Sequence, residues 1–232
     1  MAEPSNTAAL VARGSKSGRW HLDLEAPSEF TRLFGEDALI AFARCFVGID
    51  RVVSLRNLYV LNAKHGGTDG SYAKERNTGL LMVLLVGTMH ELGKALARLK
   101  DVVGKSVGPS ASNWAKLMEI RRRWHDRRIG KAIRDDMAHH LGKAGVFKAG
   151  LAAATGQPSA RLYSADGPAM KDGAFEAPWD WVMFGLGLGS PEDSELVNHL
   201  AKDVADVPEV LLSLFQEVVS MRGIPIEDRR AD

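Results

Sequence analysis

The residues best suited to chemistry are concentrated in the segment Arg134–His140, which reads Arg-Asp-Asp-Met-Ala-His-His. Asp135 precedes His139 by four residues, and Asp136 precedes His140 by the same spacing, so each pair can approach on one face of a helix. A carboxylate beside an imidazole orients the ring and favours its charged form, which is how acid–base histidines are tuned. The pattern therefore points to histidine acid–base chemistry.

Arg134 stands five residues before His139, which separates the two by about 140° around a helix. They converge only if a helix begins near Arg134, if the arginine side chain bends round the helix, or if a second subunit completes the site. A structural role is the alternative. In that case Arg134 pairs with Asp136 or a neighbouring helix, and His139 is a hydrogen-bonded residue at the edge of the core.

A basic segment lies just before this motif. Trp124 and His125 interrupt it, and its charges stand out because the whole chain carries a formal net charge of only +1. Arginine makes bidentate contacts with phosphate groups, so the segment is a candidate phosphate-binding surface with little sequence preference. The alternative is a solvated helix face with Trp124 turned to the core. The candidate residues are Arg121, Arg122, Arg123, Arg127, Arg128 and Lys131.

Other residues that could form a chemical site lack the sequence spacing that the site requires. His90-Glu91 resembles the start of a zinc-protease helix, but Lys94 occupies the position of the required second histidine. Cys45, the single cysteine, cannot form an intramolecular disulfide and is expected to be a small core residue. No metal site and no cofactor are therefore predicted.

The composition indicates a globular protein without an export signal. Apolar residues make up 45% of the 232 residues, and the N-terminus lacks the basic start and apolar run of a secretory signal. The longest apolar stretch, Leu80 to Val86, is well short of the ~20 residues that cross a bilayer, so it is expected to be the most buried part of the fold. A cytoplasmic location and no membrane partner are predicted.

Helical periodicity dominates, which favours an all-α fold, an antiparallel bundle of four to five core helices. A helix is predicted from Glu36 to His65, and a second follows the polar loop at 68–71 and carries a buried seam from Leu85 to Val103. Ser112 or Asn113 starts a third helix, and Ile133, Met137 and Leu141 mark a fourth. Ser190 and Asp206 are predicted to start two further helices, the last of which ends at Gly223.

The remaining segments decide the domain organisation. Residues 1–30 are predicted to be a flexible arm with a short anchor at Trp20-His21-Leu22, and residues 224–232 to be a tail. A single helical domain covers 31–223. Within it, residues 143–190 form a long excursion rich in Gly, Ala and Pro, with a small hairpin through Arg161–Ser164.

The Arg134–His139 segment resembles the R-x-x-x-x-H motif of the HEPN superfamily, with the polar residue that this family favours after the arginine. The resemblance covers residues 36–141. It implies a helical domain that is usually dimeric, with two copies of the motif facing each other across a shared cleft. It also implies a metal-independent endoribonuclease of the toxin–antitoxin or antiphage-defence kind, with RNA and an antitoxin protein as partners.

Carried onto this chain, the resemblance makes His139 the general acid–base residue for attack of the ribose 2′-hydroxyl on the adjacent phosphate. Arg134 stabilises charge on the phosphate oxygens. Asp135 is the polar helper that orients His139 or Arg134, and His140 and Glu91 are supporting candidates. The alternative function is a non-catalytic helical domain of the same family that serves dimerisation or partner binding.

Overall fold

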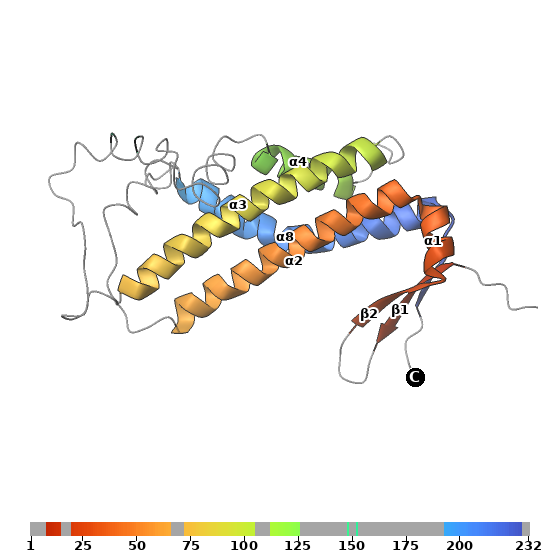
Figure 1. Ribbon diagram of the computed structural model, residues 1–232, viewed down its shortest axis with the longest axis horizontal. Coiled ribbons are helices and arrows are strands. Elements are labelled where there is room, and N and C mark those ends of the chain that lie inside the picture. Colours follow the sequence, from red (N-terminus) through yellow and green to blue (C-terminus); the bar gives the residue numbers. More distant parts are fainter. Residues whose placement is uncertain are drawn as a thin grey trace, which may run out of the picture. The chain divides into compact units, whose positions relative to one another are not determined.

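The computed structural model describes residues 8–14, 20–65, 72–104, 112–125, 148, 152 and 193–228. Of these residues 82% are helical. The main helices are α1 (Pro27–Phe34), α2 (Glu36–His65), α3 (Tyr72–Val103), α4 (Ser112–His125) and α8 (Asp193–Met221) (Figure 1). The strands are β1 (Ala9–Gly14), β2 (Trp20–Glu25) and β3 (Ile226–Asp228).

The chain divides into two compact units. The first takes its described residues from Met1–Phe46, Ala95–Glu119 and Pro208–Asp232, and the second from Val47–Lys94 and Ile120–Val207. These boundaries cut through α2, α3, α4 and α8.

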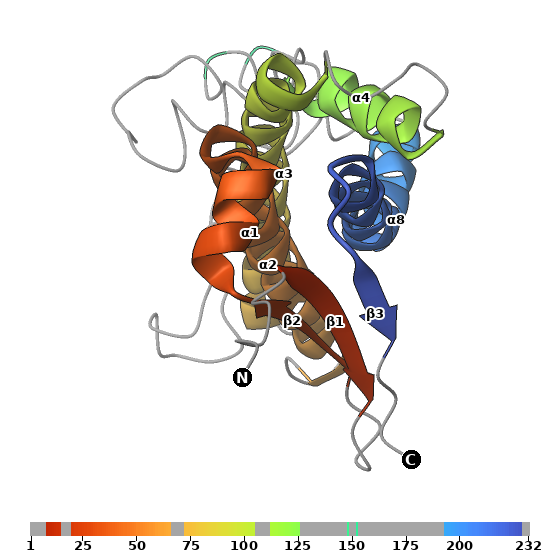
Figure 2. The ribbon, with the colours of Figure 1, turned by 90° about the vertical axis from the view of Figure 1, so that its right-hand side faces the viewer.

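A three-stranded sheet in the first unit corrects the all-α prediction. Its order is β2-β1-β3, as Figure 2 shows, with β1 antiparallel to β2 and parallel to β3. Leu10 of β1 pairs with Leu24 on one side and with Ile226 on the other. The sheet was missed because its third strand comes from the other end of the chain, and local periodicity carries no signal of such a distant partner.

The same sheet corrects the predicted flexible ends. Within residues 1–30, Ala8, Leu10 and Val11 are at most 1% exposed, and the predicted anchor at Trp20 is the start of β2. Within the predicted tail, Ile224 is buried and β3 begins at Ile226. Both ends are ordered here because each supplies backbone hydrogen-bonding partners to the other.

The core of the first unit contains a cluster of phenylalanines. Phe215 of α8 lies at ring-centroid distances of 5.2 to 6.3 Å from four other rings. Such tilted and edge-on ring pairs add stability beyond the area that they bury. The four rings come from α1 and from the first part of α2, namely Phe30, Phe34, Phe42 and Phe46.

In the second unit α2 and α3 pack antiparallel, which confirms the predicted helical hairpin. A Cβ placed at Gly48, early in α2, would lie 3.1 Å from Leu92 Cδ1, late in α3. At the other end Asn62 of α2 donates a hydrogen bond of 2.9 Å to Thr78 of α3. The predicted end of α2 also matches the structure, because the helix runs to His65.

The predicted seam of α3 is confirmed, but its most buried stretch lies elsewhere than predicted. The seam residues are all buried, whereas Leu80, at the start of the predicted core stretch, is 44% exposed. An apolar run without a polar face does not by itself determine how many of its side chains pack against another element. The buried seam residues are Leu85, Met89, Leu92, Leu96, Leu99 and Val103.

Helix α8 is one helix and not the predicted two, because it continues through Pro208. Proline removes one backbone donor and usually breaks or kinks a helix. Here the buried stripe continues on both sides of it, at Val204, Val207 and Leu211. Burial of this continuous face compensates for the lost hydrogen bond.

One helical stretch of the described chain, Asn77–Val103, is long and apolar enough to cross a membrane by length and composition alone. The buried residues in it follow the seam of α3, and 44% of its most apolar window is buried. Core helices of globular proteins pass the same test.

Candidate functional site

The predicted catalytic residues Arg134, Asp135, His139 and His140 lie outside the described residues. Three of the basic candidates and the fourth predicted helix also lie outside them. The same holds for the excursion at 143–190, apart from Lys148 and Ala152, and for the hairpin predicted within it. The three basic candidates are Arg127, Arg128 and Lys131.

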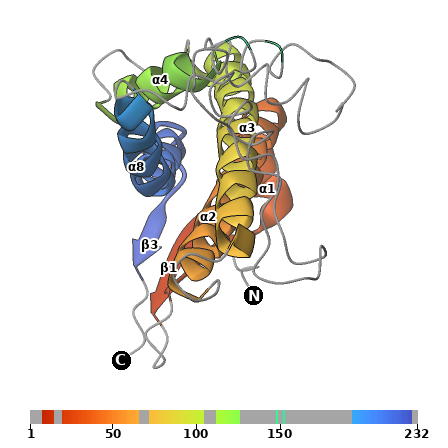
Figure 3. The same ribbon diagram turned by 90° about the vertical axis from the view of Figure 1, so that its left-hand side faces the viewer.

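The polar groups nearest in sequence to this motif lie at the end of α4, in the second unit. His90 of α3 and Asp203 of α8 are 4% and 3% exposed, and each forms a hydrogen bond with Trp124 of α4. Figure 3 shows α4 beside both α3 and α8. Because buried polar groups cost free energy unless they are hydrogen-bonded, these residues form a specific network.

On the α3 side, the ring nitrogen Nδ1 of His90 lies 2.9 Å from the carbonyl oxygen of Trp124. A carbonyl oxygen only accepts hydrogen bonds, so Nδ1 carries the proton and donates it. The rings of His90 and His125 also stack, with centroids 6.2 Å apart and planes 15° apart. Trp124 itself is 2% exposed.

Gly93 permits this close approach of α4 to α3. A Cβ added at Gly93 would lie 2.9 Å from the backbone nitrogen of His125, a separation that real Cβ atoms essentially never show. The obstacle is backbone, which cannot turn away as a flexible side chain does. Glycine is therefore required at this position for the packing seen here.

On the α8 side, Asp203 accepts one hydrogen bond and forms one ion pair with residues of α4. The indole Nε1 of Trp124 donates to Oδ2 at 2.7 Å, and Nε of Arg123 lies 3.5 Å from the same oxygen. The Arg123 and Asp203 side chains are 13% and 4% exposed, so little solvent screens this ion pair. Removing either partner would leave the other charge buried.

Arg123 also contacts His199 of α8 through Nη1 and the ring nitrogen Nδ1. A guanidinium only donates hydrogen bonds, so in this arrangement Nδ1 of His199 accepts and carries no proton. His90 and His199 are thus fixed in opposite tautomers at Nδ1. Both rings serve to position α4 against its neighbours.

The three described arginines of the basic segment divide between interior and surface. Arg123 belongs to the buried network, Arg121 is half-buried, and Arg122 is exposed. Arg122 is therefore the described arginine best placed to meet a phosphate from solvent. The sequence predicted a phosphate-binding surface that included all three arginines, but the side chain of Arg123 is largely buried.

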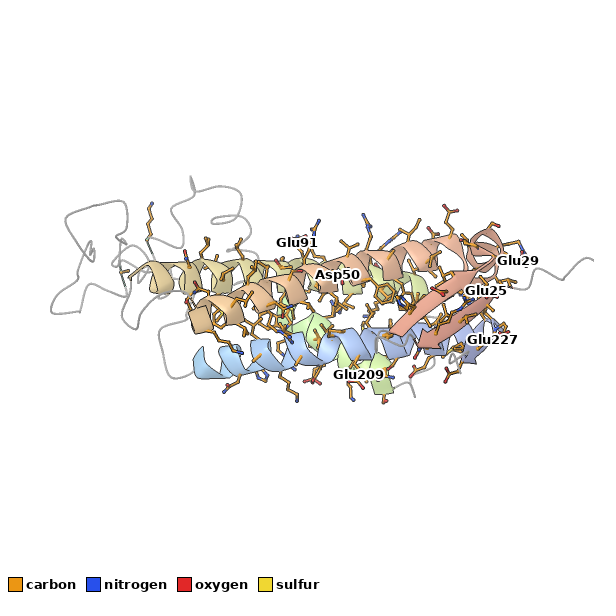
Figure 4. All side chains as sticks on the ribbon, turned by 90° about the horizontal axis from the view of Figure 1, so that it is seen from below. Glu25, Glu29, Asp50, Glu91, Glu209 and Glu227 are labelled. Carbon is orange, nitrogen blue, oxygen red and sulfur yellow. The ribbon has the colours of Figure 1, made fainter. Side chains whose placement is uncertain are left out.

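Glu91, a supporting candidate, lies on the exposed side of α3. Its carboxylate forms an ion pair of 2.8 Å with Lys94, one helical turn later. Figure 4 labels it on α3.

Cys45 is buried, and desolvation raises the pKa of its thiol to about 12. A thiol that is not ionised near neutral pH is a poor nucleophile. The prediction that Cys45 is a core residue is therefore confirmed. Among the described residues, no group of three His, Cys, Asp or Glu side chains is arranged to hold a metal ion.

Sequence reasoning missed His90, His199 and Asp203, although one signal was present. Asp203 falls on the buried face of α8, in phase with Leu200, Val204 and Val207. An acidic residue at a helix position whose neighbours on the same face are all apolar indicates that another helix supplies a buried hydrogen-bond donor. The identity of that donor is not encoded locally.

Comparison of the chain with protein family models, with curated proteins and with solved structures found no match in any of the three.

Proposed function

We propose that the protein is a metal-independent endoribonuclease of HEPN type that acts in a toxin–antitoxin or antiphage-defence role. The observation that carries the proposal is the R-x-x-x-x-H segment Arg134–His139. Its support from the fold is that the motif begins at Arg134, in the segment that follows the end of α4 at His125. The end of α4 is held from two sides by the buried bonds of Trp124 to His90 and Asp203.

In this proposal the chain supplies an acid–base group and a cation for the phosphate. His139 takes the proton of the ribose 2′-hydroxyl as its oxygen attacks the adjacent phosphorus. The 5′-oxygen of the next nucleotide leaves and is protonated, so the products carry a 2′,3′-cyclic phosphate and a 5′-hydroxyl. Arg134 stabilises the charge that grows on the non-bridging oxygens, and Asp135 and His140 orient the pair.

Substrate binding is assigned to the basic segment that precedes the motif. Arg122 is exposed on α4, in sequence continuity with Arg127, Arg128 and Lys131. Contacts of this kind bind the RNA backbone whatever its sequence. The network at Trp124 has a positioning role, because a catalytic pair must be held in a narrow range of geometries.

The test is cleavage of RNA in the presence of a chelator by wild type, Arg134→Ala and His139→Ala, purified in parallel. Arg98→Ala, an exposed arginine on α3, is the matched control. We expect wild type and Arg98→Ala to cleave and the two motif variants to lose activity by about two orders of magnitude or more. The cyclic phosphate ends identify the reaction.

A folded wild-type protein that cleaves no RNA and is not toxic on expression would overturn the proposal. Equal cleavage by wild type and His139→Ala would also overturn it, because the activity would then not depend on the proposed acid–base residue. The first outcome favours the second candidate, a non-catalytic domain for dimerisation. The specific observation behind that candidate is that α2 carries large apolar side chains that are 39% to 54% exposed, namely Ile40, Val47, Leu58, Val60 and Leu61.

A further inference from the structure

The end of the α2–α3 hairpin exposes apolar side chains from both helices. Leu58, Val60 and Leu61 of α2 are 51%, 39% and 54% exposed, and Leu80 of α3 is 44% exposed. Leu58 and Leu61 lie about 60° apart around α2, whereas Val60 lies on the side of the helix away from Leu58. The exposed apolar surface therefore surrounds this end of α2 and is not a single row.

The described part of this end has no buried core of its own. In α2 the last buried residue is Val52, and within residues 53–64 no described side chain is buried. In α3 the first buried residue that the structure describes is Val83. The helices are nevertheless paired here by the 2.9 Å hydrogen bond from Asn62 to Thr78. Contiguous apolar surface of this kind marks an interaction surface.

The charges at this end are basic. Within residues 53–64 and 77–82 the charged residues are Arg56 and Lys64, and both are exposed. A segment that covers this surface is therefore expected to combine apolar side chains with acidic ones and to lack basic ones. This requirement concerns only the sign of the charges, so it does not depend on the register in which two surfaces meet.

Residues 175–188 of the same chain have this composition. They read Phe-Glu-Ala-Pro-Trp-Asp-Trp-Val-Met-Phe-Gly-Leu-Gly-Leu, with nine apolar residues among the fourteen. Four of the nine are aromatic, and aromatic side chains dominate the energetics of interfaces. The charged residues of the segment are Glu176 and Asp180, both acidic. The segment itself lies outside the described residues.

Helix α8 begins at the end of the second unit where α2 ends and α3 begins (Figure 1). Asp203 of α8 and His90 of α3 both bond to Trp124. Asp193, the first residue of α8, stands ten residues before Asp203. Leu80 likewise stands ten residues before His90, and ten residues span about 15 Å of helix. The described chain therefore resumes, at Asp193, near the level of the exposed apolar surface.

The segment is attached close enough to reach this surface. Trp181 precedes Asp193 by twelve residues, which span at most about 40 Å when extended. Attachment to the same chain gives a segment an effective concentration in about the millimolar range, which favours it over a partner from solution. The chain itself thus supplies a suitable occupant within reach.

We propose that residues 175–188 dock on the exposed apolar end of the α2–α3 hairpin. The apolar side chains of the segment bury the exposed leucines of both helices. Its two carboxylates meet the basic charge of Arg56 and Lys64. This docking is independent of the proposed ribonuclease activity.

The first test is limited trypsin digestion of the full-length protein, with the fragments identified by mass spectrometry. Lys171 stands four residues before the segment, and the next basic side chain that trypsin recognises is Lys202, so cleavage after Lys171 reports release of the segment. Leu61→Asp should speed this cleavage about tenfold, because it removes a leucine contact and adds a charge that repels the acidic segment. Leu212→Asp is the matched control and should leave the rate unchanged, because Leu212 is 41% exposed but belongs to the first unit.

The charges are tested in the same assay. Arg56→Glu with Lys64→Glu should also speed cleavage after Lys171, because the surface then repels the acidic segment. Arg98→Glu, which changes an exposed arginine in the part of α3 that belongs to the first unit, is the control and should not.

A double-mutant cycle links the segment to the surface. Trp181→Ala should speed the cleavage, and its combination with Leu61→Asp should add little, because the contact that both residues share is already lost. Its combination with Leu212→Asp should match Trp181→Ala alone.

Unchanged cleavage after Lys171 in Leu61→Asp would overturn the proposal, as would fully additive effects of Leu61→Asp and Trp181→Ala. Two further results identify other occupants and also contradict it. Protection of Lys171 that increases with protein concentration would mean that a second copy covers the surface. Binding of wild type, but not of Leu61→Asp, to vesicles of phosphatidylcholine and phosphatidylglycerol would mean that a membrane covers it.

Discussion

The indole nitrogen of Trp124 donates a 2.7 Å hydrogen bond to the carboxylate of Asp203, and both residues are at least 97% buried. The bond joins residues that are far apart in the sequence and lies at the end of the helix that precedes the Arg134–His139 motif. It holds a tryptophan that also accepts a hydrogen bond from His90. The consequences of this network and of the surrounding core can be measured.

Asp203→Ala should destabilise the protein by about 3–5 kcal/mol, because it leaves the Arg123 guanidinium buried without its carboxylate. Urea unfolding followed by tryptophan fluorescence measures the change. Asp206→Ala, an exposed aspartate one turn along α8, is the control and should stay within about 0.5 kcal/mol of wild type. Equal stability of the two variants would contradict the network.

Gly93→Ala and Gly48→Ala should have different effects on stability. Alanine ordinarily stabilises a helix interior by about 0.5–1 kcal/mol relative to glycine. At Gly48 the new Cβ meets the end of the flexible Leu92 side chain, so the cost of contact is small. At Gly93 it meets the backbone of His125, so we expect a clear loss in the free energy of unfolding. The reverse order would show that α3 and α4 do not approach closely.

Phe215→Ala should cost about 3–5 kcal/mol, since it removes the ring that contacts four other phenylalanines in the first unit. Thermal unfolding by circular dichroism gives the shift. Leu212→Ala on the same helix serves for comparison, because its side chain is 41% exposed. A small effect at both positions would contradict the assigned core.

The Cys45 thiol should resist alkylation at pH 8 in the native protein and react once the protein is unfolded. Its raised folded-state pKa of about 12 also makes stability depend on pH. The unfolded thiol ionises at a lower pH than the folded one, so the stabilising contribution is complete below the unfolded pKa of about 9 and is lost as pH rises towards 12. Wild type should therefore lose stability relative to Cys45→Ala across this range. Rapid alkylation of the native protein would show that the thiol is accessible.

Arg122→Ala should weaken RNA binding and reduce the slope of log affinity against log salt by about one, without a change in melting temperature. Arg122 is exposed, whereas Arg123 is part of the buried network. Arg123→Ala should accordingly lower the melting temperature. If Arg122→Ala leaves both the affinity and the salt slope unchanged, α4 does not contact the phosphates.

Local pattern accounts for the parts of the fold that are set within a few turns of chain. The four-residue and three-residue steps from Leu85 to Val103 predicted a buried seam, and each of these residues is buried. The glycines after His65 predicted the end of α2. Cys45 was predicted in the core from its phase in the same helix. In each case the signal and the element that it specifies occupy the same short segment.

Local sequence pattern gave the wrong prediction where packing against distant segments decided the structure. Pro208 predicted a helix start, yet the apolar face on both sides of it keeps α8 continuous. Leu80 to Val86 predicted the most buried stretch, yet Leu80 is exposed because burial depends on what packs against it.

The sequence by itself determined the helices α2, α3 and α4, the buried seam of α3 and the Arg134–His139 motif, because these depend on residue types at fixed local spacing. Only the tertiary structure decided that β1 pairs with β3, that His90 and Asp203 converge on Trp124, and that Arg123 points inward while Arg122 stays exposed. The physical reason is the same in each case. A hydrogen bond or ion pair between distant segments forms because burying its two partners together is favourable. That free energy depends on residues far apart in the sequence, so it produces no periodic pattern of residue types.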